Sequence, residues 1–281
     1  MLEKGKMLPL DARNQLAVES PAMFSRIIFA GFDIRKILSK TAIIGGCGGL
    51  GVIVGEILAR TGIGKLVLLD RDIVEEENFN RLVYNRDDAG KPKAECLAKK
   101  LESIRNSAGI APKFHLKTEI YQEDVVAWME LEDLMEKSDI IFTCFDNEAA
   151  RIELNAYATS FNKPLIDGGT SENALRGTVI TVLPGKTPCL ECYWSTETLV
   201  SIEEVDPDEQ ELKSSILKVP CGASLATTMN IIASLQTEQA FKILFGYGEI
   251  APMIRVSLEE SFSVSLAHPK RRSGCPACGD L

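Results

Sequence analysis

A glycine-rich turn lies between a short apolar, β-branched run and a helix-like segment, and it constrains the fold more than any other feature. The glycines of this turn are Gly46, Gly48 and Gly51. Residues 41–44 predict a buried strand, 52–60 predict a helix, and 65–70, which read KLVLLD, predict a second strand. A strand, a tight turn, a helix and a strand within about 30 residues form a βαβ unit, which implies a parallel sheet.

The remaining predicted elements continue this alternation of strands and helices. Apolar runs bounded by turn residues predict strands, and apolar residues three or four positions apart predict helices. Further strands are expected at 139–144, 164–167 and 177–183, and further helices at 91–106, 147–158 and 227–245. Residues 253–267 alternate weakly, as antiparallel strands do. The pattern predicts an α/β, Rossmann-like fold with a mainly parallel sheet, helices on both faces and antiparallel C-terminal strands.

The predicted elements fit one domain. The chain has 281 residues, enough for one large α/β domain or two small ones. We expect a domain over 24–281, preceded by an extension over 1–23 that is either irregular or a short helix. Within the domain, residues 203–211 read EEVDPDEQE and lack periodicity. We therefore expect an exposed crossover loop at about 195–220.

Composition and charge exclude several classes of protein. The net charge of −9 argues against a general nucleic-acid binder, because phosphate contacts need clustered lysine and arginine. The first residues contain no apolar segment typical of a signal peptide, and no uninterrupted apolar run reaches membrane-spanning length. We therefore expect a cytoplasmic protein, in which the eight cysteines indicate metal binding or catalysis before disulfides.

The glycine turn suits a nucleotide. Glycine lets the backbone approach a phosphate closely, and the following helix N-terminus supplies free N–H groups and a positive dipole. Asp70 ends the second predicted strand, where a carboxylate commonly accepts a hydrogen bond from a ribose hydroxyl. These features suit an NAD-dependent oxidoreductase equally well, so the turn alone leaves the kind of nucleotide open.

The residues after Asp70 resemble those of a known superfamily. Asp70, Asp72, Val74, Asn78 and Arg81 form the pattern D-x-D-x-V-x-x-x-N-x-x-R, with Lys93 twelve residues later. This pattern resembles the ubiquitin-activating-type superfamily, which includes the adenylyltransferases of the molybdopterin and thiamine pathways. Acyl adenylation places charge on the α-phosphate and on the leaving pyrophosphate, so the resemblance implies that Arg81 and Lys93 neutralise it. Solvated surface charge is the alternative for both side chains.

The same resemblance implies further site residues. Asp146 and Asn147 follow the predicted strand DIIFTC and are similar to the superfamily's T-D-N motif, in which the aspartate helps hold Mg²⁺. A carboxylate at the C-terminal end of a strand suits a hard cation, although Asp146 can equally be a helix N-cap. Arg151, one turn later, is expected to support the site. Arg26 matches an arginine that in relatives reaches ATP bound to the partner subunit, which implies a homodimer.

Two C-x-x-C pairs form the most specific constellation of the chain. The pairs are Cys189 with Cys192 and Cys275 with Cys278. Four thiolates complete a closed tetrahedral site, which is typical of structural zinc. The long gap between the pairs exceeds that of a zinc ribbon and fits a clamp that ties the C-terminus back to the domain. Redox-active pairs or unrelated free thiols are the alternative.

Cys221 is the candidate nucleophile. It follows the acidic loop and precedes a predicted helix, and a helix N-terminus lowers the pKa of a thiol. The segments GGTSENA, NFNRLVY and VPCGASLATTM resemble the activating enzymes of the ubiquitin-fold modifier, over roughly residues 24–281. In those enzymes the matching cysteine forms a thioester with the modifier. The alternative is a buried cysteine with no covalent role.

The sequence thus predicts an enzyme that uses ATP, Mg²⁺ and Zn²⁺. It would adenylate the C-terminal glycine carboxylate of a ubiquitin-like modifier ending in Gly-Gly and then form a thioester on Cys221. A conjugating enzyme would be a further partner. An adenylyltransferase for a ubiquitin-like sulfur-carrier protein is the closest alternative. An NAD-dependent oxidoreductase and a non-catalytic scaffold are the others.

Overall fold

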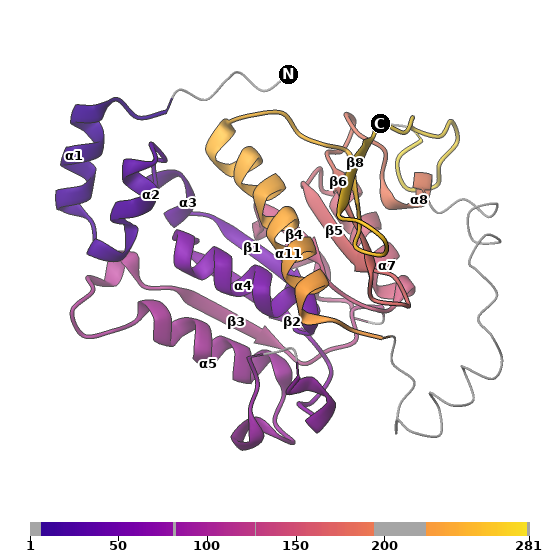
Figure 1. The fold of residues 1–281 in the computed structure, drawn as a ribbon, viewed down its shortest axis with the longest axis horizontal. Coiled ribbons are helices and arrows are strands. Elements are labelled where there is room, and N and C mark those ends of the chain that lie inside the picture. The colour runs from indigo at the N-terminus through magenta and orange to yellow at the C-terminus, as the bar shows by residue number, and fades with distance from the viewer. Residues whose placement is uncertain (1–6, 81–82, 127, 194–222, 280–281) are drawn as a thin grey trace.

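A computed structural model describes residues 7–80, 83–126, 128–193 and 223–279. Its centre is one eight-stranded sheet in the order β3-β2-β1-β4-β5-β6-β7-β8 (Figure 1). The first five strands of this order are parallel, and the last three pair antiparallel. The sheet confirms the predicted mainly parallel architecture with antiparallel C-terminal strands. The strands are β1 (Thr41–Gly45), β2 (Lys65–Leu69), β3 (Lys117–Tyr121), β4 (Ile140–Thr143), β5 (Leu165–Thr170), β6 (Arg176–Val182), β7 (Met253–Ser257) and β8 (Ser263–Ala267).

Helices cover both faces of the sheet. The helices are α1 (Leu10–Glu19), α2 (Ser25–Phe29), α3 (Arg35–Leu38), α4 (Gly49–Thr61), α5 (Lys93–Arg105), α6 (Leu131–Lys137), α7 (Glu148–Ser160), α8 (Leu190–Tyr193) and α11 (Ala226–Phe241). One core cluster packs α4, α5 and α11 against alternate strand residues such as Ile44 and Phe142. A second cluster packs α6 and α7 against their strand neighbours Ile43 and Ile141. Parallel strands buried on both faces explain why they are continuous apolar runs in the sequence.

One predicted helix and one strand differ from the sequence-based expectation. The helix expected at 227–245 divides into α11 and a π-helical turn, Lys242–Gly246, and it ends at Gly246, whose φ is +77°. The strand β3 was not predicted, because it lies at the sheet edge and three of its five residues are polar or charged. An edge strand lacks the apolar run that marks a central strand.

The N-terminal helices pack onto the domain. Leu16 of α1 belongs to a small core with Phe24, Ile28, Ile34 and Phe114. Next to this core, the fully buried Arg105 donates hydrogen bonds to the carbonyl oxygens of Ala59, Ile63 and Phe114. Within the described part of the predicted N-terminal extension, Leu10–Glu19 form a helix. In the part of the chain that the structure describes, no helix combines the length and apolar character needed to cross a bilayer.

Candidate functional site

A cavity of about 420 Å³ opens at the carboxyl ends of the parallel strands. It lies where β1 has β2 on one side and β4 on the other. The connections leave in opposite directions at such a point, so the strand ends diverge and leave a crevice. The predicted site residues that line the cavity are Gly46, Gly48, Asp70, Asp72, Asn78, Lys93, Asp146 and Asn147.

The glycine turn has a different requirement at each of its three positions. Gly46 has a φ of +93°, which only glycine adopts freely. A Cβ on Gly51 would lie 1.8 Å from the carbonyl oxygen of Gly46, so the helix packs on the turn only without a side chain. A Cβ on Gly48 would meet no atom within 4 Å. Gly48 therefore has open space beside its backbone, as the close approach of a phosphate requires.

Asp70 holds the turn from the end of β2. Its Oδ2 accepts a hydrogen bond from the backbone N–H of Cys47 at 2.6 Å, and its Oδ1 accepts one from Asp72 at 2.8 Å. Burial raises the pKa of the Asp70 carboxyl, and the two backbone hydrogen bonds and Lys93 oppose that rise. Each oxygen keeps a second lone pair, so Asp70 can also accept a hydrogen bond from a ligand hydroxyl.

Tyr84 links the turn to α5. The buried Tyr84 hydroxyl lies 2.7 Å from the carbonyl oxygen of Cys47 and 3.1 Å from that of Lys93. Burial raises the pKa of this phenol above its usual value, so the hydroxyl stays a proton donor. The sequence gives no signal for this brace, because Tyr84 lies 37 residues after Cys47 and only the fold brings the two together.

Lys93 places a cation on the cavity wall. It is the first residue of α5, and its side chain is only 13% exposed, with Nζ 3.0 Å from Oδ2 of Asp72. Asn78 is buried and accepts a hydrogen bond from the backbone N–H of Glu75 through Oδ1. The predicted Arg81 lies outside the described residues. An ammonium group on a largely buried stem is suited to neutralise a phosphate.

The carboxylate of Asp146 faces the cavity without a partner among the described residues. The alternative that Asp146 caps the following helix is wrong, because Asn147 is the N-cap of α7. The Asn147 side chain accepts a hydrogen bond from the backbone N–H of Ala149 at 2.9 Å. With the cap supplied by Asn147, the Asp146 carboxylate is left available for a cation, consistent with the hard-cation preference for carboxylate oxygen.

A buried ion pair supports the far wall. Arg151 of α7 donates to both carboxylate oxygens of Asp167, at 2.8 and 2.5 Å, and Asp167 is fully buried. Burial opposes the charge of Arg151, but the adjacent Asp167 outweighs it, so the pKa of the guanidinium is raised. Asp167 also accepts a hydrogen bond from the Thr143 hydroxyl at 2.6 Å. The sequence analysis missed Asp167, although a carboxylate inside an apolar strand is a signal for a buried pair.

The other predicted site residues lie either away from this cavity or outside the described residues, and of the remaining cysteines Cys144 lines it. Arg26 is exposed on α2 and does not line it. Cys221 and the crossover loop at about 195–220 lie outside the described residues. Cys47, Cys96 and Cys144 are buried, and burial raises the pKa of their thiols, to about 12 for Cys144. Raised thiol pKa values agree with packing roles for these three.

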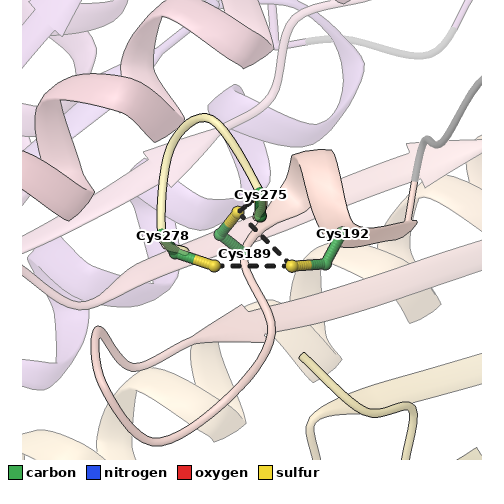
Figure 2. Close-up of side chains that lie close together, drawn as sticks. All are labelled: Cys189, Cys192, Cys275 and Cys278. Atoms are coloured by element: carbon green, nitrogen blue, oxygen red, sulfur yellow. Dashed lines mark hydrogen bonds between the residues drawn. The ribbon is translucent and has the colours of Figure 1, made fainter. Parts of the chain in front are cut away.

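The two C-x-x-C pairs come together next to the core that α6 and α7 form with the sheet, and Figure 2 shows the four side chains close to one another. Cys189 and Cys192 lie at α8, and Cys275 and Cys278 lie in a turn after β8. Their sulfur atoms all lie within 4.8 Å of one another, with contacts of 3.4, 3.6 and 3.9 Å. Four thiolates around zinc lie about 3.8 Å apart, since each Zn–S bond is about 2.3 Å. The donor set and spacing therefore fit a four-thiolate metal site.

Known proteins share this sequence pattern and fold. The model of the family described as ThiF matches residues 21–277. The ubiquitin-like modifier-activating enzyme 5 of Drosophila mojavensis is 36% identical over 222 residues, covering 78% of this chain and 54% of that protein. The protein of the same name from Oryza sativa subsp. japonica is 32% identical over 257 residues, covering 88% and 58%. The chain thus spans about half the length of the curated relatives it matches.

Solved structures match over almost the whole chain. The crystal structure of E. coli MccB with ATP has a TM-score of 0.72 at 23% identity, covering 95% of this chain and 80% of that chain. A structure of PaaA has a TM-score of 0.67 at 23% identity, covering 94% and 84%. At this level of identity the likeness shows a shared fold.

We predict that Asp167→Asn lowers the free energy of unfolding by about 3 kcal/mol, because a buried ion pair then loses one of its two charges. Urea unfolding measures the change. The matched control is Glu259→Gln, which removes an exposed partner of Arg176 and should leave the midpoint nearly unchanged. Equal losses in the two variants would show that burial does not set the strength of the Asp167 pair.

Proposed function

The chain belongs to the ThiF family, and we propose that it uses ATP to activate the C-terminal glycine carboxylate of a ubiquitin-like modifier. The observation that carries the proposal is the cavity, which is lined by the glycine turn, by Lys93 and by Asp146, a carboxylate with no partner among the described residues. Hydride transfer with NAD needs neither a phosphate-neutralising lysine nor a cation-binding carboxylate there. The names of the relatives from Drosophila mojavensis and Oryza sativa support a ubiquitin-like modifier as the substrate.

In this proposal the cavity residues bind ATP by distinct contacts. Asp70 accepts a hydrogen bond from the ribose, and the phosphates lie against the backbone at Gly48 and the N-terminus of α4. Lys93 and Arg81 neutralise charge on the phosphates. Asp146 is the residue that would hold Mg²⁺, and a cation held there would supply positive charge to the phosphates.

The first chemical step is adenylation. A terminal carboxylate oxygen of the modifier attacks the α-phosphorus of ATP, and the bond from that phosphorus to the oxygen bridging the β-phosphate breaks. Pyrophosphate leaves with both electrons of that bond, and the products are an acyl adenylate and pyrophosphate. Negative charge grows on pyrophosphate during the step, so a fixed cation such as Lys93 favours the transition state over the ground state.

The second step in the proposal transfers the acyl group to Cys221. The thiol first loses its proton to solvent, and the thiolate attacks the acyl carbon while the carbon–oxygen bond to AMP breaks, with AMP keeping both electrons of that bond. The products are a thioester and AMP. A sulfur-carrier adenylyltransferase would stop at the acyl adenylate, so thioester formation separates the two functions. A conjugating enzyme would receive the acyl group from the thioester.

A homodimer fits the position of Arg26. Arg26 is exposed on α2, away from the cavity of its own chain, so a second subunit would be needed to bring it to a nucleotide. We propose that Arg26 completes the cavity of the partner.

The four cysteines would hold a structural zinc ion. The site is closed, because four protein ligands leave no open position, so it supplies folding energy rather than catalysis. Metal binding there would tie the turn after β8 to α8, which follows β6.

We predict that Asp146→Ala lowers ATP–pyrophosphate exchange, measured with a ubiquitin-like protein ending in Gly-Gly, by about 100-fold. The reason is the loss of the carboxylate that would hold Mg²⁺. Glu148→Ala is the matched control, because Glu148 begins the same helix but does not line the cavity. Unchanged exchange in the Asp146 variant would refute the metal role, and absent exchange in the unaltered protein with every such carrier would refute adenylation.

We predict one zinc ion per chain in protein purified anaerobically, measured by elemental analysis. Cys275→Ser should release the zinc and lower the unfolding temperature, because three thiolates leave the tetrahedral site incomplete. Cys96→Ser is the control, since Cys96 is buried in α5 outside the cluster, and it should retain the metal. Fresh protein without zinc would contradict the assignment.

We predict that ATP and a Gly-Gly carrier give a thiol-labile adduct that is absent in Cys221→Ala, while pyrophosphate exchange survives. The substitution removes the acyl acceptor of the second step and leaves the first intact. Non-reducing gels and intact-mass spectrometry detect the adduct. Persistence of the adduct in the variant would exclude Cys221 as the carrier, and no adduct in either protein would favour the sulfur-carrier function.

A further inference from the structure

A second cavity, of about 320 Å³, lies between α6 and the sheet. None of its lining residues lines the nucleotide cavity. It exists because the β3–β4 connection carries only α6, of seven residues, whereas α4, α5 and α7 have thirteen each. The short helix leaves the face of β2 and β3 near Lys65 and Glu119 uncovered. A volume of this size falls in the range of small-ligand sites.

Two aromatic rings form part of the cavity wall. Tyr121 ends β3, and Trp128 comes from the segment before α6. Their ring centroids lie 4.8 Å apart with an interplanar angle of 43°, and both side chains are half-buried. The faces of such rings carry partial negative charge and attract cations, with tryptophan the strongest.

The charged groups of the cavity leave one carboxylate in excess. Lys65 pairs with Glu119 at 2.6 Å, and Lys137 pairs with Asp133 at 3.7 Å. Glu130 has no hydrogen bond or ion pair among the described residues, and it makes no side-chain cap although it occupies the N-cap position of α6. The charged lining therefore consists of two internally compensated pairs and one unpaired negative group.

The charges around Tyr121 also show an excess of negative charge in this cavity. Burial raises the pKa of its phenol, and the negative charges of Glu119 and Glu130 raise it further. The Glu130 carboxylate is therefore close enough to Tyr121 for its charge to reach the aromatic wall of the cavity.

We propose that this cavity binds a guanidinium group, as in an arginine side chain, stacked on the Tyr121–Trp128 pair and paired with Glu130. A planar guanidinium can stack on a ring and donate two parallel hydrogen bonds to one carboxylate, which an ammonium group cannot do. The two lysines do not prevent this binding, because Glu119 and Asp133 already neutralise them. The site lies beyond the proposed adenylation chemistry and does not depend on it.

Calorimetric titration with N-acetyl-arginine amide tests the proposal, with N-acetyl-citrulline amide as the neutral control of the same shape. Binding should be saturable, and about tenfold weaker for the citrulline compound, which lacks the charge. n-Propylguanidine, which has the same single charge but lacks the peptide groups, distinguishes a protein side chain from a small metabolite. Tighter binding of the arginine amide indicates a protein side chain, and tighter binding of n-propylguanidine indicates a small metabolite.

Three variants locate the binding. The chain has two tryptophans, Trp128 and Trp194, so in Trp194→Phe the emission reports Trp128 and should change along the same titration curve. Glu130→Gln should weaken binding about fivefold, since the pair is partly exposed. Glu132→Gln, on the same helix but outside the cavity, should bind unchanged.

The outcomes that overturn the proposal are distinct from those that overturn adenylation. Absence of saturable heat, equal affinity for the citrulline compound, or equal weakening in the Glu130 and Glu132 variants would each refute a guanidinium site. Tighter binding of N-acetyl-aspartate amide would assign the cavity to anions through the lysines instead. Pyrophosphate exchange should stay unchanged in the Glu130 variant, which shows that the fold and the first cavity are intact.

Discussion

The close approach of α4 to the glycine turn determines where every other part of the nucleotide cavity lies. The carbonyl oxygen of Gly46 occupies the space that a side chain on Gly51 would need, so the first turn of the helix rests directly on the end of β1. This contact aims the free N–H groups of the helix at the cavity. Asp70 and Tyr84 then fix the loop between them through the N–H and carbonyl of Cys47. The protein holds the turn from both sides, so the turn loses little conformational entropy when a phosphate binds.

Opposite this rigid turn, charge is held in place by burial. Asp167 is fully buried and binds both Arg151 and Thr143, so the guanidinium has a fixed position on the wall. Lys93 and Asp146 differ from that pair, because Lys93 has an exposed partner in Asp72 and Asp146 has none among the described residues. The cavity thus combines fixed charges in its wall with groups that a ligand can engage. Fixed wall charges together with groups free to contact a ligand suit a reaction in which negative charge moves from one phosphate to another.

Much of this arrangement follows from the sequence, and the exceptions have physical causes. Parallel strands buried on both faces are continuous apolar runs bounded by turn residues, so they can be recognised in the sequence. The spacing of the glycines locates the turn. The edge strand β3 carries no such run, and its position depends on pairing with β2. The sequence could not separate Asp146 from Asn147 as the cap of α7, because both side chains are good caps. Asp167 was missed because its partner Arg151 lies on α7, and only the fold brings the two side chains together.

The antiparallel half of the sheet depends on a different kind of contact. Residues 263–266 of β8 are exposed, including Val264 and Leu266, so burial contributes little to holding this edge strand. Pairing with β7 is its main contact with the sheet, so backbone hydrogen bonds hold this strand more than buried side chains do. The cysteine cluster lies directly after β8 and binds back to α8, which follows β6. A metal ion held by the four thiolates would therefore close the chain around the strands that burial holds least firmly, and it would do so without altering the parallel half where the nucleotide cavity lies.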